Sequence, residues 1–366
     1  MTKTIHILTR PLEDQNVRAF WAPLLANKQL LSESGFIIRP FETATPALVD
    51  CDTLILTSSF WRGPWTERRE EAIPFIEKCV NDSKQLLYFD RASTSGTVNA
   101  DVLPLVHRYY KTNLLKDRSL YQQELYGLRQ FTDYYHRNYG VLDPIPALSS
   151  PVRYSSDLGK LRPSWNTALA NYSLLGPRLS TLYRKLPLTW LMKPTTRFNA
   201  PSVDRSIDVS CRMGTTYKYE TVAYQRRQIA DRLARFRRAD RISKIAYFRE
   251  LRDSKIVTSP FGFSEVNYKD FETFLSGAIL LKPDMSHIET YPDFYRDGET
   301  FISHKWDFSD LDEKVEEVLD NYSVWLHVAE AGQDLYRQYT VGPQAAERFV
   351  SHFVDLLAEA ETSPHT

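Results

Sequence analysis

The fold is decided by the stretch Ser259-Pro-Phe-Gly-Phe-Ser-Glu-Val-Asn-Tyr-Lys-Asp-Phe-Glu-Thr-Phe-Leu-Ser-Gly-Ala-Ile-Leu-Leu-Lys-Pro-Asp284. The residues just before it, 255–258, are mostly β-branched or apolar and predict the end of a strand. Pro260 and Gly262 then interrupt regular structure and predict a loop. The stretch therefore opens as a strand followed by a loop.

The second half of this stretch predicts a helix and another strand. Between Val266 and Leu275 the apolar residues fall at helical spacing, and Gly277 is a typical end for that helix. The short apolar run 278–281 then reads as a buried strand. A helix that starts beside the carboxyl end of a strand offers free backbone N–H groups, which suit a phosphate group.

The stretch resembles the donor-binding segment of GT-B glycosyltransferases, above all the exostosin-like and group 1-like branches. Those enzymes carry a Ser-Pro-x-Gly-Phe loop, a basic residue three positions before a Glu, and a Gly followed by an apolar strand. The matching positions are Ser259–Phe263, Lys269, Glu272 and Gly277, with unbroken spacing over about 25 of the 366 residues. The plainer alternative is a buried strand–helix unit with no ligand.

The resemblance implies a set of donor-binding residues. It makes Glu272 the partner of the nucleotide ribose and Lys269 a contact to phosphate or base. It places the donor diphosphate on the main-chain amides of Gly262, Phe263 and Ser264, and it counts Ser259 among the donor-binding residues. Arg212 follows the first expected strand of a second domain, where GT-B enzymes have an Arg that meets the diphosphate.

One departure from the family pattern concerns the first of two glutamates. Many retaining GT-B enzymes have a Glu at the position that Ser264 occupies here, and Glu265 lies one residue away. We include Glu265 among the candidate donor-binding residues. Because the pattern is not intact, the resemblance does not indicate whether the sugar linkage is retained or inverted.

The composition predicts a soluble protein of two domains. A chain of 366 residues exceeds the size at which single cores stop growing, roughly 250–300 residues. Lys plus Arg and Asp plus Glu both number 46, so net charge gives no drive toward nucleic acid. Three scattered cysteines, no signal peptide and no long apolar run favour the cytoplasm, with peripheral membrane contact as an open alternative.

The first part of the chain predicts a Rossmann-like domain, residues 1–200, that binds the acceptor. Strands expected near 4–9, 36–39, 53–57 and 85–90 alternate with helices, which favours a parallel sheet. Asp90 lies at the end of the last of these strands, where such sheets place ligands. It is our candidate for the catalytic base, and an Asx turn is the structural alternative.

Residues 104–140 are rich in Tyr, Arg and Lys. After an expected strand at 106–111, they predict a polar and aromatic loop region that faces the cleft. Aromatic faces stack on sugar rings, and basic side chains bind anionic groups. We assign His136 to acceptor binding, with Asp133 as a partner for acid–base work. A simply hydrogen-bonded histidine is the alternative.

The segment from Asp143 to Pro201 is dense in proline and predicts a connection with short helices, one at 165–172. A nucleotide-sugar-binding Rossmann-like domain is expected at 201–340. Residues 341–366 are expected to form a crossover helix and tail, because the last helix of GT-B enzymes crosses back to the first domain. The predicted class is therefore α/β, GT-B type, with two parallel sheets facing an interdomain cleft.

A long helix expected at 221–236 has a basic face. Its cationic residues are Arg226, Arg227, Arg232, Arg235, Arg237 and Arg238. Such a face fits anionic lipid or nucleic acid, or is simply solvated. Since acidic residues interrupt it and the total charge is zero, the solvated face is the preferred reading.

The resulting expectation is a glycosyltransferase that moves a sugar from a nucleotide-sugar donor to a hydroxyl of a glycan or glycolipid. No cofactor and no metal are expected, because the Asp-x-Asp motif of GT-A enzymes is absent from the sequence. Basic side chains and helix N-termini would then offset the diphosphate charge. Two alternatives stay open: a non-catalytic binder of nucleotide-sugars or glycans on the same fold, and a nucleic-acid or membrane adaptor.

Overall fold

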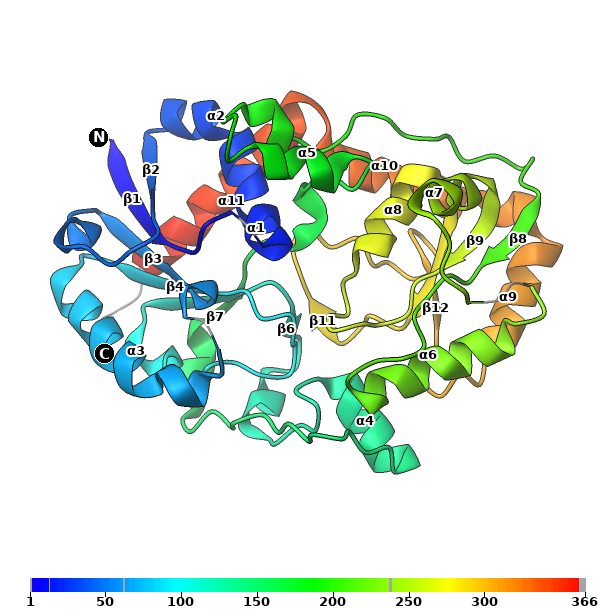
Figure 1. Ribbon diagram of the computed structural model, residues 1–366, viewed down its shortest axis with the longest axis horizontal. Helices are drawn as coiled ribbons and strands as arrows, with labels where there is room; N and C mark the ends of the chain where they lie inside the picture. Colours follow the sequence, from blue (N-terminus) through cyan, green and yellow to red (C-terminus); the bar gives the residue numbers. More distant parts are fainter. Residues whose placement is uncertain (1, 13, 62, 237–238, 362–366) are drawn as a thin grey trace.

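The computed structural model describes residues 2–12, 14–61, 63–236 and 239–361 (Figure 1). Its first half is built on a six-stranded sheet in which every neighbouring pair is parallel. In spatial order the strands are β2 (Phe36–Phe41), β1 (Lys3–Leu8), β3 (Thr53–Thr57), β4 (Leu86–Asp90), β5 (Arg108–Lys111) and β7 (Leu161–Pro163). Every residue of β3 and β4 is buried, as expected for central strands with helices on both faces.

The helices of this half are α1 (Gln15–Ala26), α2 (Lys28–Glu33), α3 (Trp65–Asp82), α4 (Gln130–Tyr139) and α5 (Gly176–Leu182). Asp14 caps α1, because its carboxylate accepts the main-chain N–H groups of Asn16 and Val17. Phe20 and Trp21 on α1 are buried against the sheet. This cap fixes where α1 begins, and α1 contributes residues to the cleft described below.

The second half is built on a smaller parallel sheet (Figure 1). In spatial order its strands are β12 (Ile302–His304), β10 (Ile279–Pro283), β9 (Ser254–Thr258) and β8 (Ile207–Ser210). Its helices are α6 (Glu220–Arg232), α7 (Lys244–Asp253), α8 (Tyr268–Ser276), α9 (Leu311–Asp320) and α10 (Tyr322–Thr340). The predicted strand–loop–helix–strand unit is present as β9, the loop 259–267, α8 and β10. Gly277 ends α8 with φ of 67°, a conformation that glycine adopts without strain.

The last helix, α11 (Gly342–Glu361), returns to the first half. Phe349 and Phe353 on α11 pack against Trp165, and the apolar side of the helix shares a core with β1 and β3. Two parallel sheets and a returning C-terminal helix confirm the predicted fold class, α/β of the GT-B type.

A third, two-stranded sheet joins the halves. β6 (Leu114–Leu115) comes from the first half and pairs antiparallel with β11 (Ile288–Glu289) from the second. The main-chain N–H of Lys116 donates to the carbonyl of His287 at 2.8 Å and extends this pairing. The two halves are therefore connected by main-chain hydrogen bonds as well as by the chain itself.

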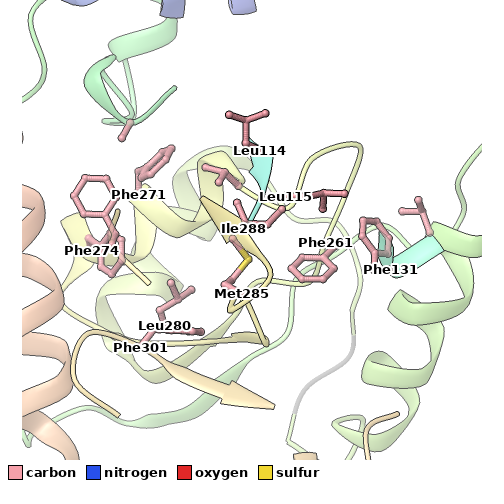
Figure 2. Close-up of a cluster of buried hydrophobic side chains, with 14 of the residues drawn as sticks. Leu114, Leu115, Phe131, Phe261, Phe271, Phe274, Leu280, Met285, Ile288 and Phe301 are labelled. Carbon is pink, nitrogen blue, oxygen red and sulfur yellow. The ribbon is translucent and has the colours of Figure 1, made fainter. Parts of the chain in front are cut away.

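The hydrophobic core continues across this junction. Figure 2 shows Leu114 and Leu115 beside Ile288, with Phe261 facing Phe131. The rings of Phe131 and Phe261, which come from opposite halves, have centroids 4.8 Å apart. The predicted division near residue 200 falls between β7 and β8 and stays a prediction, because the halves share this core.

Two predictions for the first half are wrong. Residues 104–140 are not an open loop after the strand, since they contain α4, whose Phe131 and Tyr135 lie one turn apart and are buried. The expected helix at 165–172 is only a 3-10 turn, Thr167–Leu169. There the Asn166 side chain accepts the N–H of Ala168, a local bond that competes with helix formation.

The remaining short elements are 3-10 helices at Pro46–Val49, Ser58–Phe60, Leu103–Leu105, Arg118–Gln122, Ser155–Lys160 and Thr189–Met192. Among the helices of the described ranges, none is both long enough and apolar enough to cross a bilayer.

Candidate functional site

A cavity of about 340 Å³ lies between the two halves. From the first half it is lined by Asn16, Phe20, Arg91, Ser93, Thr112, Asn113, Trp165, Asn166 and Thr167, and from the second half by Tyr217, Gly262, Phe263, Ser264, Val266, Asn267 and Tyr268. We call it the cleft cavity. Three predicted donor-binding residues, Gly262, Phe263 and Ser264, thus line a cavity between the halves.

The loop that carries these residues is anchored on one carboxylate. Asp270, in the first turn of α8, is fully buried and forms an ion pair with the fully buried Lys282 of β10 at 3.2 Å. The hydroxyl of Tyr295 donates to it at 2.6 Å, and the main-chain N–H of Asn267 donates at 3.0 Å. Ser259, predicted to contact donor, is buried and donates its hydroxyl to Asp270. Ser259 therefore positions the loop from beneath.

Three further side chains hold the main chain of the loop. Nε of Arg226 donates to the carbonyl of Phe261 at 2.8 Å, and the side chain of Gln225 accepts the N–H of the same residue at 2.8 Å. Nε of Arg129, from the first half, donates to the carbonyl of Phe263 at 2.8 Å. These bonds fix both sides of Gly262, where a Cβ would lie 3.1 Å from Oδ1 of Asn267. A larger residue there would crowd the side chains of Asn267 and Arg226, which hold the loop.

Polar contacts also cross the cleft. Nδ2 of Asn113 donates to Oγ of Ser264 at 2.7 Å, and the hydroxyl of Tyr268 donates to Oδ1 of Asn16. Ser95 donates to Glu265, which is fully buried behind the loop. The second carboxylate oxygen of Glu265 has no hydrogen-bond partner among the described residues. Burial raises the pKa of Glu265, while the Ser95 hydrogen bond and the nearby Arg129 charge act in the opposite direction.

The cleft cavity has a positive character. Arg91 is the one charged side chain among its described lining residues, which include no Asp or Glu. Its guanidinium stacks over the ring of Phe20 at 5.0 Å and donates through Nη2 to the carbonyl of Asn16. Nη1 is buried and has no partner within the described part of the chain. Burial lowers the pKa of Arg91 to about 10, so it stays cationic at neutral pH.

The predicted residues Glu272, Lys269 and Arg212 form a second group, next to the cleft cavity and outside its lining. Glu272 is half-buried and lies one helical turn beyond the cavity residue Tyr268, on the same side of α8. Its Oε2 accepts the hydroxyl of Tyr247 at 2.8 Å. Burial raises the pKa of Glu272 to about 7, against the opposing effects of Tyr247 and Lys269.

Lys269 and Arg212 are engaged with protein groups. Nζ of Lys269 donates to the carbonyl of Arg212, and burial lowers the pKa of Lys269 to about 8. The guanidinium of Arg212 forms an ion pair with Glu250 at 3.0 Å. The charge of Lys269 acts on Glu272 and lowers its pKa, while Arg212 is turned toward Glu250 on α7.

Asp90, the predicted base, lines a different cavity. One of its oxygens accepts the Tyr109 hydroxyl and the Lys111 ammonium, each at 2.8 Å, and the other accepts the N–H of Ala92 at 2.9 Å. This second cavity, of about 790 Å³, lies on the other side of the loop after β4. Its aromatic lining residues are Trp61, Trp65, Tyr88 and Tyr154. The structure therefore does not bring Asp90 into the lining of the cleft cavity.

His136 lines neither of these two cavities. Its ring stacks on Tyr126 with centroids 3.9 Å apart, and Nδ1 lies 3.0 Å from the carbonyl of Val141. Asp133 is bound elsewhere, to the N–H of Tyr126 and to the guanidinium of Arg137. The expected His136–Asp133 pair is not formed, because both side chains already have local partners.

The basic face of α6 is largely neutralised. Arg227 pairs with Glu220, Arg232 with Asp312 and Arg235 with Glu316. Arg226 points inward to the loop 261–263 instead. Arg237 and Arg238 lie outside the described residues. A solvated face with local ion pairs, the preferred reading of the sequence, agrees with these contacts.

Sequence reasoning missed Arg91 and Asn113 as cleft residues. Arg91 directly follows Asp90 at the carboxyl end of a strand, so its position was a usable signal. Asn113 carries no comparable signal, since it reaches the cleft only through β6. Within the described ranges, no cluster of three or more His, Cys, Asp or Glu side chains is arranged to hold a metal ion. Independence from metal stays a prediction.

Comparisons with known proteins give only distant likenesses. No protein-family model matches the chain, and no curated protein sequence matches it. Among solved structures, a glycosyltransferase from Rickettsia africae aligns with 99% of this chain and 100% of its own, at 9% identity and a TM-score of 0.46. HepE from Anabaena, solved with UDP-glucose, aligns with 98% of this chain and 100% of its own, at 8% identity and a TM-score of 0.43.

A third structure, a putative UDP-N-acetylglucosamine 2-epimerase from Listeria monocytogenes, aligns with 100% of this chain and 99% of its own. The identity is 11% and the TM-score 0.39. Likenesses at these values are too distant to carry functional conclusions, and the exostosin-like branch stays a prediction. The functional argument therefore rests on the geometry of the cleft.

Proposed function

We propose that this protein is a glycosyltransferase that binds a nucleotide-sugar donor in the cleft cavity. The observation that carries the proposal is Arg91, a half-buried cation whose Nη1 is buried and unpartnered, in a cavity whose described lining has no carboxylate. A cation in such a place favours an anionic ligand, because the buried N–H group on its Nη1 is costly to leave without a partner. The opposite wall is the glycine loop at the start of α8, a position that suits phosphate.

The parts of the donor can be assigned to the two groups of residues. In this proposal the diphosphate lies between Arg91 and the main chain of Gly262–Ser264. The nucleoside extends along α8 toward Glu272, whose carboxylate receives the ribose hydroxyls. Lys269 and Arg212 are then nearby cations. Each would have to release its present protein partner before it could contact the donor. A volume of about 340 Å³ lies in the range of small-molecule sites, roughly 300–1,000 Å³.

The acceptor is proposed to be a glycan or glycolipid that enters from the first half. The second cavity supports this, because its tryptophan and tyrosine side chains offer surfaces for sugar rings. Asp90 remains the proposed base, since it lines the second cavity. It lies next to the loop that separates this cavity from the cleft. His136 remains a predicted contact for an acceptor long enough to leave both cavities.

The test is a thermal-shift screen against nucleoside mono- and diphosphates, followed by donor hydrolysis. Bound ligand raises the apparent stability by mass action, so a nucleoside diphosphate should raise the melting temperature of the wild type and of an Arg249→Ala control. The same ligand should have little effect on Arg91→Ala. An equal shift in Arg91→Ala and the control would contradict the cleft assignment.

A non-catalytic binder of the same ligands is the second candidate. It is favoured by one observation: the described lining of the cleft has no carboxylate, and Asp90, which lines the second cavity, is already bound by Lys111 and Tyr109. Slow release of free sugar from a bound nucleotide-sugar distinguishes the two. A transferase hydrolyses its donor slowly without acceptor, and a binder releases it unchanged.

A further inference from the structure

The segment 175–197 presents large apolar side chains to solvent. Exposed there are Leu175, Leu182, Leu186, Leu188 and Trp190, of which Leu186 is 55% and Trp190 56% exposed. Single exposed apolar residues are ordinary, but several within one short segment indicate an interaction surface. We call these five residues, with the cations named below, the 175–197 face.

The segment is held to the protein, so its exposed residues are presented in a fixed way. Leu191 and Met192 follow Trp190 directly and are almost fully buried. They belong to the 3-10 helix Thr189–Met192, which packs on α1. The inward side chains anchor the turn, and the outward Leu188 and Trp190 remain in solvent.

The charge of this face has one sign. Between Asp157 and Asp204 the sequence contains no Asp or Glu. The cationic residues of the face are Arg178, Arg184, Lys185, Lys193 and Arg197, all exposed. Cations next to exposed Leu and Trp are typical of segments that lie in a membrane interface, where the apolar residues enter and the cations meet anionic headgroups.

A second segment with exposed apolar residues lacks the neighbouring cations, so exposed apolar side chains and cations do not always occur together on this protein. Leu142, Ile145 and Leu148 are 64%, 68% and 51% exposed, but residues 142–152 contain no Lys or Arg. In Figure 1, α5 lies at the top of the view and α4, which precedes residues 142–148, lies at the bottom. The two segments therefore serve as a test and a matched control.

An apolar groove lies beside the 175–197 face. Tyr183 borders an apolar groove of about 280 Å³ against α1 and α2, lined also by Trp21, Leu25 and Ile37. Arg10, Lys28 and Glu42 lie at this groove as well, so the charge beside it is positive on balance. The face lies next to α1, whose residues Asn16 and Phe20 line the cleft cavity.

We propose that the 175–197 face docks the protein on an anionic lipid bilayer. Docking goes beyond sugar transfer and does not depend on it. If the proposed function holds, the same contact brings the cleft next to a lipid-linked acceptor. The basic side of α6, the sequence-based candidate for such a contact, is occupied by ion pairs in its described part and does not take this role.

The experiment is co-sedimentation of the full chain with vesicles of phosphatidylcholine and phosphatidylglycerol in equal parts, and with vesicles of phosphatidylcholine alone. Wild type should bind the anionic vesicles, lose binding with added salt and bind the neutral vesicles weakly. Trp190→Ser with Leu188→Ser should weaken binding about tenfold or more, because it removes the apolar part. Lys185→Glu with Lys193→Glu should abolish the preference for anionic vesicles.

Ile145→Ser is the matched control and should bind as wild type does. All these side chains are solvent-exposed, so an unchanged thermal unfolding transition checks that each variant is folded. The proposal is overturned if wild type does not bind anionic vesicles, or if Ile145→Ser loses as much binding as the Trp190 variant. A concentration-dependent dimer that Trp190→Ser dissociates, without vesicle binding, would assign the face to a second copy and also overturn it. Failure to bind vesicles leaves nucleotide binding in the cleft unaffected.

Discussion

The hydroxyl of Tyr247 on α7 donates a 2.8 Å hydrogen bond to Oε2 of Glu272 on α8. This bond orients a half-buried carboxylate whose pKa burial has raised to about 7. A carboxylate fixed in this way has an oxygen left to accept further hydrogen bonds. It connects the two helices that flank the proposed nucleoside position.

Replacement of Glu272 by Ala should weaken binding of a nucleoside diphosphate by about 10- to 100-fold, the range expected when hydrogen bonds to a charged group are lost. Titration calorimetry measures this change. The control is Glu330→Ala, an exposed glutamate on α10. A Glu272→Ala protein that is folded and binds the nucleotide as tightly as wild type would remove the central assignment.

The raised pKa of Glu272 predicts a pH-dependent stability. Because the folded-state pKa of about 7 exceeds the ordinary value of 4.5, the folded protein binds this proton more tightly than the unfolded chain. This group therefore makes the free energy of unfolding fall as pH rises from about 4.5 to about 7. Glu272→Gln should remove that part of the fall, on the order of 2 kcal/mol. Urea unfolding at pH 5 and pH 8 measures it, with Glu330→Gln as the control that should leave the fall unchanged.

Arg91 should contribute to affinity through the charged phosphate groups of the ligand. Arg91→Ala should lower the affinity for a nucleoside diphosphate about tenfold or more, and should lower the affinity for the nucleoside alone much less. Arg91→Lys should recover part of the loss, because it restores the charge without the planar guanidinium. An equal loss for nucleoside and diphosphate would show that Arg91 supports the fold of the cleft and does not bind phosphate.

The Asp270–Lys282 pair should be a major support of the donor loop. Lys282→Met leaves a fully buried carboxylate without its cation and should lower the free energy of unfolding by about 3–5 kcal/mol. Asp270→Asn combined with Lys282→Met should recover part of this loss, because no buried charge remains. Lys305→Met changes an exposed lysine and should have little effect. Urea unfolding of the four proteins checks the prediction, and a small loss in Lys282→Met would contradict it.

Much of the fold was predictable because its signals are local. The β-branched residues before Ser259, the apolar spacing in 266–275 and the apolar run 278–281 each specify one element, and all three elements are present. The helix α4 was missed because its sequence, with three Tyr among mostly polar residues, has the polarity of a loop. Its helical signal is the spacing of Phe131 and Tyr135 with Gly140 at the end, where φ is 64°.

The candidate site was predictable only in part. Gly262–Ser264 could be found because one motif specifies them, and the motif also gave Glu272. Asn113 contacts this loop from the other half of the molecule and Arg91 lines the same cavity, and no spacing in the sequence measures a distance across a cleft. Partners such as Tyr247 for Glu272, or Glu250 for Arg212, depend on how α7 packs. The sequence offers the candidates, and tertiary packing decides which are engaged.

The small sheet of β6 and β11 has a consequence for motion. Rotation of one half away from the other, as in a hinged clamp, would break main-chain hydrogen bonds and expose the apolar side chains of Leu115 and Ile288. Entry and exit of a ligand are therefore expected to use rearrangement of side chains at the rim, such as Tyr268 against Asn16, while the two sheets keep their mutual orientation.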